Sequence, residues 1–286
     1  MTLDICTESC LDAAVGSIDL AAADATVRAL LPAASAVALR HFRTELIADD
    51  KGGAQGYDPV TEADRGIEDL LREGLSAAFP DHRIVGEERG TTGPADASVE
   101  WVIDPIDGTK AFVTGATGWG VLIGLVADGA AVGGWMLQPY LGELFSAVAG
   151  DGRFERGDEQ RTLRTRATTR LDEAIVYSTH PSMFTTPDEQ AAYARIAGAT
   201  RLQRYGGDCY SYGLLALGFV DLVVESSMQA YDIVALIPIV EAAGGVITDR
   251  TGASPLDGGF IVAAATPELH AQALALANAD PTEETP

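Results

Sequence analysis

The chain has 286 residues, of which 47% are hydrophobic, so it carries enough apolar side chains for a substantial core. Its 42 acidic and 19 basic side chains give a formal net charge of −23, which argues against a nucleic acid or an anionic membrane as the main partner. Three scattered cysteines, Cys6, Cys10 and Cys209, exclude a disulfide framework and make a poor zinc site.

The N-terminal residues carry acids and no basic segment, and no apolar run reaches about 18 residues. We therefore expect neither a signal peptide nor a membrane span, and we assign the protein to the cytoplasm.

The first half of the chain predicts two helices followed by an antiparallel sheet. Apolar residues recur at helical spacing over 12–47, with a break expected near Pro32, and Thr61 opens a helix that runs to Phe79. Apolar runs separated by short turns then predict hairpins. We expect strands at 83–85, 100–103, 119–127, 131–137 and 143–148, and loops at 52–58 and 89–98, the second of them a candidate lid or dimer contact.

Residues 150–172 are charged and irregular in pattern, and we place a subdomain boundary there. Beyond it, strands and helices alternate, which is typical of an α/β layer. The expected elements are strand 174–178, helices 184–197 and 206–218, strand 220–225, helix 232–243, strands 245–248 and 259–263, and helix 267–278. We divide one continuous catalytic unit into residues 1–160, with most candidate metal ligands, and residues 161–286, with Asp232 and the substrate pocket.

The stretch from Trp101 to Thr109 carries the most specific chemical signal. An apolar run leads into Asp104-Pro-Ile-Asp107-Gly108-Thr109. Two carboxylates at the end of a buried strand are unfavourable unless a cation lies between them, and oxygen ligands suit a hard ion such as Mg²⁺. The Gly-Thr pair can turn backbone N–H groups towards a phosphate. The segment therefore predicts metal-dependent phosphate chemistry.

Three further acidic clusters lie at predicted junctions, where distant segments can converge. They are residues 58–64 with Asp64, the run Gly86-Glu87-Glu88, and Tyr231-Asp232 before the apolar segment that ends at 241–245. Each alone has a structural explanation: a first-turn helix acid, a solvated surface charge, and a helix N-cap. The order of all four clusters along one chain is a much stronger indication than any one of them.

In this order the motifs resemble those of the inositol monophosphatase family of Mg²⁺-dependent, lithium-sensitive phosphomonoesterases, over residues 40–265. Tyr231 stands where the family usually has tryptophan. The resemblance implies an α+β or α/β fold, a layered α-β-α-β-α sandwich, and a homodimer. It also implies a small-molecule phosphate ester as substrate, and the net charge of −23 leads us to expect no nucleic-acid or membrane partner.

The resemblance further implies roles for individual residues. Two or three Mg²⁺ ions, for which Mn²⁺ could substitute, would be held by Glu87, Asp104, the carbonyl of Ile106, Asp107 and Asp232. Asp64 and Thr109 would orient and deprotonate the attacking water, which makes them catalytic together with Glu87. The N–H groups of Gly108 and Thr109 would hold the phosphate. Bound cations of this kind also resolve the conflict between a net charge of −23 and an anionic substrate.

The substrate prediction rests on two segments that resemble the histidinol-phosphate phosphatase branch, 204–213 and 229–238. Histidinol phosphate carries an ammonium and an imidazole, for which Asp208 and Glu225 would supply countercharges, with Arg204 as a further contact. A helix N-cap and an exposed strand-end acid are the structural alternatives for the two acids.

We predict an Mg²⁺-dependent phosphatase that hydrolyses L-histidinol phosphate in histidine biosynthesis. The alternatives are an inositol-1-monophosphatase or broad sugar-phosphate phosphatase and, from another class, a non-catalytic metal-binding or RNA-linked relative. The four histidines, His41, His82, His180 and His270, are scattered and predict surface or packing roles.

Overall fold

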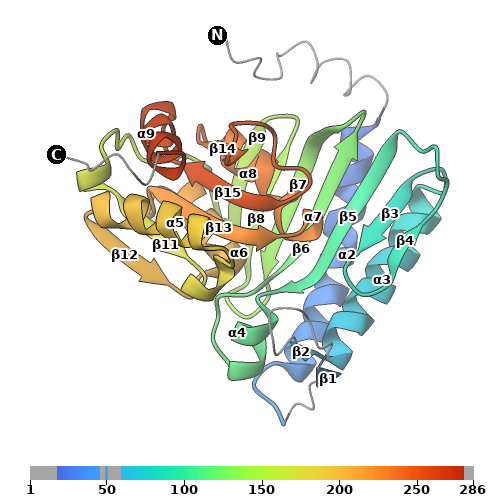
Figure 1. Cartoon of the computed structure of the whole chain (residues 1–286). Helices are drawn as coiled ribbons and strands as arrows, with labels where there is room; N and C mark the ends of the chain where they lie inside the picture. Colours follow the sequence, from blue (N-terminus) through green and yellow to red (C-terminus); the bar gives the residue numbers. More distant parts are fainter. Residues whose placement is uncertain (1–17, 46–48, 51–58, 280–286) are drawn as a thin grey trace.

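The structure is a computed structural model that describes residues 18–45, 49–50 and 59–279. The expected loop 52–58, Cys6 and Cys10 lie outside these residues. In the described part, helices and two sheets alternate as five layers, which confirms the expected fold class (Figure 1).

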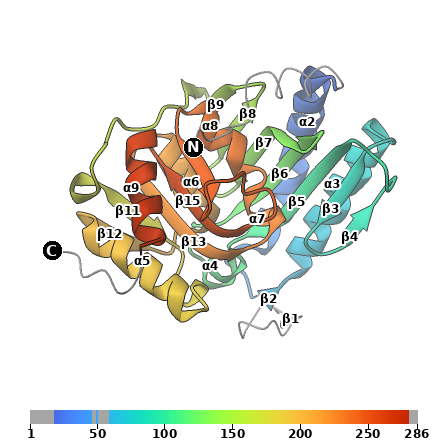
Figure 2. The same ribbon diagram turned by 45° about the horizontal axis from the view of Figure 1, so that its top comes forward.

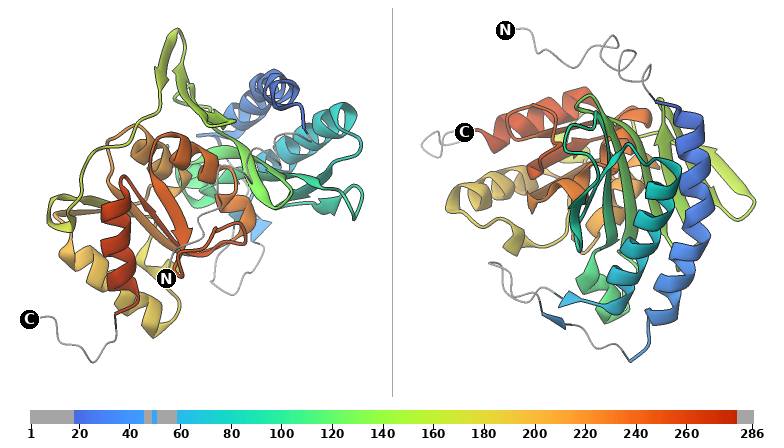
Figure 3. Two further views of the ribbon diagram at one scale, coloured as in Figure 1. Left: turned by 90° about the horizontal axis from the view of Figure 1, so that it is seen from above. Right: turned by 90° about the vertical axis from the view of Figure 1, so that its right-hand side faces the viewer.

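Two antiparallel helices form the outer layer on one side, α2 (Leu20–His41) and α3 (Glu62–Ala78) (Figure 3, right). Pro32 lies inside α2 without ending it, contrary to the expected break. The buried face of the helix, which includes Val27 and Leu31, packs on α3 and the sheet, and this burial outweighs the roughly 3 kcal/mol cost of an interior proline.

Helix α2 is also the one helix of the described chain that is long and apolar enough to cross a membrane, by length and composition alone. No span was expected there. In the fold, one side of the helix is buried in the protein core.

The larger sheet has eight strands in the order β10-β9-β8-β7-β6-β5-β3-β4. All neighbours are antiparallel except β3 and β5, which are parallel. Its strands are β3 (Arg83–Gly86), β4 (Gly90–Thr92), β5 (Val99–Asp107), β6 (Gly120–Ala127), β7 (Ala130–Gln138), β8 (Glu143–Val148), β9 (Asp151–Arg156) and β10 (Glu159–Thr162). The short helix α4 (Thr109–Thr114) follows β5, and a two-stranded pair, β1 (Asp49–Asp50) and β2 (Pro59–Val60), lies apart from both larger sheets.

The smaller sheet has five strands in the order β12-β11-β13-β15-β14, with antiparallel pairing only at β15. These strands are β11 (Ile175–Ser178), β12 (Leu202–Tyr205), β13 (Leu222–Met228), β14 (Val246–Asp249) and β15 (Gly259–Ala264). The helices are α5 (Pro187–Ala199), α6 (Asp208–Ala216), α7 (Ala230–Ile233), α8 (Leu236–Ala242) and α9 (Pro267–Ala277), with 3₁₀ turns at Leu171–Glu173 and Pro181–Met183. Helices α5 and α9 lie on the outer face of this sheet, while α6 and α8 lie between the sheets (Figure 2).

Clusters of buried side chains fill the spaces between the layers. One cluster, with Trp101 and Ile123, joins α2 and α3 to the large sheet. A second joins the other face of that sheet to α6, α8 and the small sheet, and it contains Leu122, since successive strand residues point to opposite faces. A third joins the small sheet to α5 and α9. The two sheets thus share a continuous packed interior.

Several expected elements differ from the structure. Residues 151–162 form the β9–β10 hairpin, which projects from the body (Figure 3, left), rather than an irregular linker. In β9, Gly152 and Phe154 point inward, and the charged residues next to them point outward. The alternation of inward and outward residues that marks a strand is therefore difficult to recognise in this charged segment. The large sheet accordingly continues to Thr162.

The other differences are local. Part of the expected loop 89–98 is strand β4, and the strand β12 and the helix α4 were not expected. The helix expected over 232–243 is divided into α7 and α8, which are connected at Val234 and Ala235.

Candidate active site

The acidic motif lies within β5 and not after it, and a bulge determines where its side chains point. Asp104 pairs with Leu122 and Asp107 pairs with Gly120, so three steps along β5 match two along β6. In a regular strand, residues three apart point to opposite faces, and the extra residue of a bulge corrects this difference. Pro105, which has no N–H to donate to a neighbouring strand, lies inside the bulge. Both aspartates can therefore face the same space.

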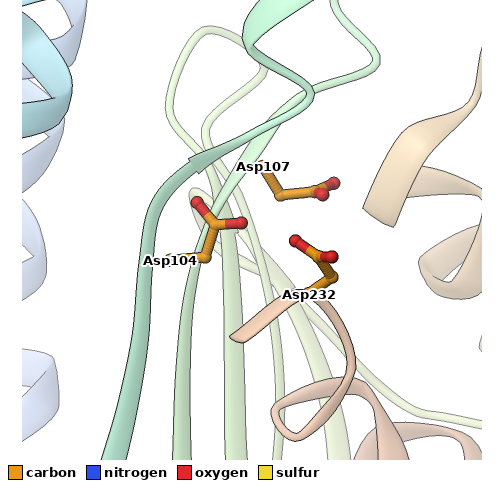
Figure 4. Close-up of side chains that lie close together, drawn as sticks. All are labelled: Asp104, Asp107 and Asp232. Carbon is orange, nitrogen blue, oxygen red and sulfur yellow. The ribbon is translucent and has the colours of Figure 1, made fainter. Parts of the chain in front are cut away.

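Asp232 completes this group from the other half of the chain. It lies in α7, after a second bulge in β13 between Glu225 and Met228. Its Oδ2 accepts the N–H of Gln229 at 2.7 Å, which makes it the acid of a capping box rather than the N-cap itself. One carboxylate oxygen each of Asp104, Asp107 and Asp232 lies within 4.8 Å of the others, and Figure 4 shows the three side chains directed towards one another.

Backbone donors hold two of these carboxylates in place. Asp104 Oδ1 accepts the N–H of Ile106 at 3.0 Å. Asp107 Oδ2 accepts the N–H of Cys209 at 2.6 Å, in the first turn of α6, where the helix dipole favours a negative charge. Cys209 is a buried free thiol, and its side chain as well as its backbone N–H forms a hydrogen bond with Asp107.

Repulsion and burial act on the whole group. Burial, followed by the charges of Glu87 and Asp107, raises the pKa of Asp104 well above its usual value. Burial and then the charge of Asp107 likewise raise the pKa of Asp232. Glu87, which follows β3 and donates its N–H to Ile103 O at 3.2 Å, is thus close enough to act on both.

Asp64 lies in the first turn of α3, where one of its carboxylate oxygens is hydrogen-bonded and the other is not. Its Oδ2 accepts the N–H of Thr61 at 2.9 Å and also the Thr61 hydroxyl, in a capping box. Its buried Oδ1 has no hydrogen-bond partner in the described structure. Burial raises the pKa of Asp64 to about 6. Asp64 is thus paired with Thr61, while Thr109, the other residue expected to act on the attacking water, donates its hydroxyl to Ile106 O at 3.1 Å.

The turn after β5 offers backbone donors. Gly108 has a φ of 81° and is the N-cap of α4, which begins at Thr109. The first N–H groups of a helix have no partner within the helix and suit an anion. A Cβ on Gly108 would lie 3.0 Å from the Cβ of Asp208, so the turn and the start of α6 touch.

A cavity of about 630 Å³ opens beside this turn. It is lined by Gly108, Thr109, Lys110, Ala111, Thr114, Ala116, Thr179, His180, Ser182, Met183, Gly206 and Asp208. The three clustered aspartates are not in the wall of this cavity, although Asp107 directly precedes Gly108, which is.

The two expected substrate acids differ in position. Asp208 lines the cavity with a left-handed backbone (φ 43°), which is strained for a non-glycine residue. Burial and the charges of Asp107 and Glu225 raise the pKa of Asp208 to about 8. Glu225 lies behind the cavity wall, where its carboxylate accepts the Thr179 N–H at 3.0 Å and the Tyr212 hydroxyl at 3.1 Å. It therefore supports Thr179, which does line the cavity.

The expected contact Arg204 is an exposed residue of β12 and is not part of the cavity wall. Sequence reasoning missed Lys110, Thr179 and His180. Lys110 directly follows Gly108 and Thr109, the residues predicted to bind the phosphate, and Thr179 and His180 follow the end of β11. All three therefore lie beside predicted junctions, and this position could have identified them as candidate site residues. His180 Nδ1 accepts the Ser182 N–H at 3.1 Å, which leaves the proton of the neutral ring on Nε2.

The donor set fits a hard divalent cation. In the described structure, no lysine or arginine forms an ion pair with Asp104, Asp107 or Asp232. The pKa values of all three are raised. Buried carboxylates are neutralised either by protons, as the raised pKa values indicate for the metal-free protein, or by a bound cation, and carboxylate oxygens suit Mg²⁺, Mn²⁺ and Ca²⁺.

Comparisons with known proteins agree with this site. A model of the inositol monophosphatase family matches residues 19–281. The bifunctional phosphatase IMPL2 of Arabidopsis thaliana is 38% identical over 86% of this chain and 72% of its own. A histidinol-phosphatase of Chlorobaculum parvum is 38% identical over 72% of this chain and 78% of its own. A Nus factor SuhB of Haemophilus influenzae is 31% identical over 83% and 89%.

Among solved structures, an inositol monophosphatase from Zymomonas mobilis superposes with a TM-score of 0.78, at 36% identity over 89% of this chain and 96% of that one. The layered fold and these relatives indicate a phosphatase. The chain belongs to the inositol monophosphatase family.

The raised pKa values predict how the metal-free protein responds to pH. The carboxyls of Asp64, Glu225 and Asp208 titrate at about 6, 7 and 8 in the fold, above their values of roughly 4 in an unfolded chain. Between these values the folded state binds more protons, so the free energy of unfolding falls as pH rises from 5 to 8. Urea unfolding in EDTA should show this fall.

Urea unfolding over the same pH range with saturating Mg²⁺ provides the comparison with the EDTA measurements. Cation binding to the folded state alone raises stability, and the gain should be larger at pH 8, where the carboxylates carry their charge. Equal stability with Mg²⁺ and EDTA at pH 8 would contradict a preformed cluster.

Proposed function

We propose that this protein is an Mg²⁺-dependent phosphomonoesterase that hydrolyses L-histidinol phosphate to L-histidinol and phosphate, a step of histidine biosynthesis. The choice of substrate rests on one observation: Asp208 is an acid in the cavity wall, beside the turn at Gly108. Burial, and after it the charges of Asp107 and Glu225, raise the pKa of Asp208, so acidic groups surround this end of the cavity. Such a pocket favours a substrate whose alcohol part is cationic.

The metal site would consist of Glu87, Asp104, the Ile106 carbonyl, Asp107 and Asp232. Bound Mg²⁺ would lower the pKa of water and neutralise charge on the phosphate and the leaving oxygen. The Thr109 hydroxyl fixes the direction of the Ile106 carbonyl through its hydrogen bond.

The free Oδ1 of Asp64 would accept the proton of the attacking water. A pKa of about 6 keeps this carboxylate ionised at neutral pH and near the optimum for a general base. The backbone N–H groups of Gly108 and Thr109 would bind the phosphate oxygens. Lys110, exposed in the cavity wall, would attract the phosphate into an otherwise acidic pocket.

Relatives support both this substrate and an alternative. The name histidinol-phosphatase belongs to the Chlorobaculum relative, and the Zymomonas structure is that of an inositol monophosphatase. The hydroxyls of Thr179 and Ser182 in the cavity wall favour a polyol phosphate as the second candidate. Location in the cytoplasm, assembly as a homodimer and a lack of nucleic-acid or membrane partners remain proposals, and gel filtration with light scattering tests the dimer.

A phosphate-release screen over histidinol, inositol, glycerol and sugar phosphates tests the proposal. We expect kcat/KM for histidinol phosphate to exceed that for inositol 1-phosphate by at least about tenfold, as one charge-assisted hydrogen bond can provide. EDTA should abolish turnover of every ester. A preference for inositol 1-phosphate would replace the first candidate by the second, and Mg²⁺ uptake without turnover of any ester would indicate a non-catalytic relative.

A further inference from the structure

A fully buried carboxylate lies directly behind the turn that carries Glu87. Glu68, on α3, has no solvent-exposed surface. Its Oε2 accepts the N–H of Glu88 at 2.7 Å, and its Oε1 accepts the N–H of Arg89 at 3.0 Å. Two consecutive backbone donors after Glu87 are thus bound to the two oxygens of one side chain, and hydrogen bonds to a charged acceptor are the stronger kind.

Arg72, one turn further along α3, ties this carboxylate to the next strand. It donates from Nε to Glu68 Oε1 at 2.7 Å, from Nη1 to Thr92 Oγ1 at 2.8 Å, and from Nη2 to Gly90 O. The buried carboxylate is therefore paired and fully hydrogen-bonded, as a buried charge must be. Helix, turn and β4 form one connected network.

The fit between α3 and the turn leaves no spare room. A Cβ on Gly86 would lie 2.2 Å from Glu68 Oε1 and 2.8 Å from Arg72 Nη2. Only glycine permits the backbone to approach the carboxylate this closely. Gly86, the residue before Glu87, and the two residues after it are consequently all fixed against Glu68.

We propose that Glu68 is a positioning residue, which holds the backbone around Glu87 so that this carboxylate already faces Asp104 and Asp232 before a cation binds. The inference rests on the proposed function in one respect, namely that Glu87 is a metal ligand. Asp104 and Asp107 lie within the nine-residue strand β5, whereas Glu87 follows the four-residue strand β3. The sheet holds Glu87 through its N–H to Ile103 O, and Glu68 binds the N–H groups of the two residues that follow. The Glu68 carboxylate thus extends the constraint from the sheet into the turn between β3 and β4.

A purely structural role for the Glu68–Arg72 pair makes a different prediction, because it would alter stability and leave metal affinity unchanged in the folded protein. The test is therefore Glu68→Gln, which keeps the side-chain volume and removes the charge and one acceptor. The matched control is Asp69→Asn, on the adjacent residue of the same helix. Asp69 is exposed, and its carboxylate accepts two hydrogen bonds from the Arg89 guanidinium, at 2.7 and 2.8 Å. Asp69 therefore contacts a side chain of the same turn, whereas Glu68 binds the backbone of the turn.

Isothermal titration of the metal-free proteins with Mg²⁺ provides the main measurement. We expect Glu68→Gln to weaken Mg²⁺ binding by at least about tenfold, the lower end of what loss of a ligand-supporting group causes, and Asp69→Asn to change it by less than about twofold. The Mg²⁺ concentration for half-maximal activity should shift by the same factor, while kcat at saturating Mg²⁺ recovers to within about threefold of wild type. A folded Glu68→Gln protein with wild-type Mg²⁺ affinity would overturn the inference.

Hydrogen exchange on the wild-type protein gives a second test that needs no folded variant. The amides of Glu88 and Arg89 should be protected in EDTA, and Mg²⁺ should slow their exchange by less than about threefold, because the turn is already ordered. Fast exchange in EDTA that slows only with Mg²⁺ would show that the cation orders the turn, and the inference would fail. If wild-type protein bound no Mg²⁺ at all, the proposed function would fail while protected amides would still support the role of Glu68 in fixing the turn.

Discussion

Replacing Asp104 with asparagine is expected to lower kcat/KM for every phosphate ester by about 10²- to 10³-fold, the loss typical of one essential electrostatic contact. Asp104 is one of the three clustered aspartates, with 2% of its surface exposed. The amide keeps the shape of the side chain, and its oxygen can still accept the Ile106 N–H that Asp104 Oδ1 accepts. The charge is what the substitution removes. Steady-state kinetics at saturating Mg²⁺ measure the effect.

Stability separates this loss from a damaged fold. Burial and neighbouring acids raise the pKa of Asp104, so its ionised form destabilises the metal-free fold at neutral pH. Asp104→Asn should therefore unfold in EDTA at the same urea concentration as wild type or a higher one, and it should gain less stability from Mg²⁺. Asp172→Asn, which alters an exposed acid paired with Arg170, is the control and should change neither property. Retained activity, or a fold weakened in EDTA, would contradict the role of Asp104.

The part of the site that sequence predicts best is its list of acids, because each acidic cluster lies at a predicted junction between elements. Asp104 and Asp107 stand out for this reason, and the structure brings them together with Asp232. The bulges that make this convergence geometrically possible are not evident from the residues, since Pro105 is compatible with a strand end as well as with a bulge.

Contacts between distant segments account for most of what sequence missed. The pairing of Asp64 with Thr61 is local and was visible as a helix start, but the Cys209 N–H bound to Asp107 joins residues 102 positions apart. The strand β12 has an exposed edge and no alternation of buried residues, so it lacks the usual signal of a strand. Glu68 had no signal either, because a helix acid that packs inward looks the same in sequence as one that faces solvent.

The layered fold was predictable in class and less so in detail. Apolar runs separated by short turns identified strands such as β6, whose Leu122 and Ile123 face different cores. The β9–β10 hairpin was missed because its outward residues are charged and its two inward positions include a glycine. The division of the chain at residue 160 falls inside that hairpin, and as a proposal about subdomains it awaits a test by limited proteolysis.

Replacing Asp208 with asparagine should remove the preference for a cationic substrate. Asp208 lines the cavity beside Gly108, and no arginine or lysine of the described structure forms an ion pair with it. A hydrogen bond to a charged group contributes about 1.5–3 kcal/mol, so kcat/KM for histidinol phosphate should fall roughly 10- to 100-fold. Most of the change should appear in KM, because the ammonium group is remote from the reacting phosphorus.

A substrate that lacks a cationic group distinguishes the loss of the Asp208 contact from damage to the cluster of Asp104, Asp107 and Asp232. For p-nitrophenyl phosphate, the variant should keep kcat/KM within about threefold of wild type, since its leaving group offers Asp208 nothing to pair with. Asp188→Asn, at an exposed acid on α5 that pairs with Arg250, is the matched control and should leave both substrates unaffected. An equal loss for both substrates would mean that Asp208 acts on the phosphate end through its neighbour Asp107. No loss for either would leave the cavity without a specific acid, and the polyol phosphate would become the better candidate.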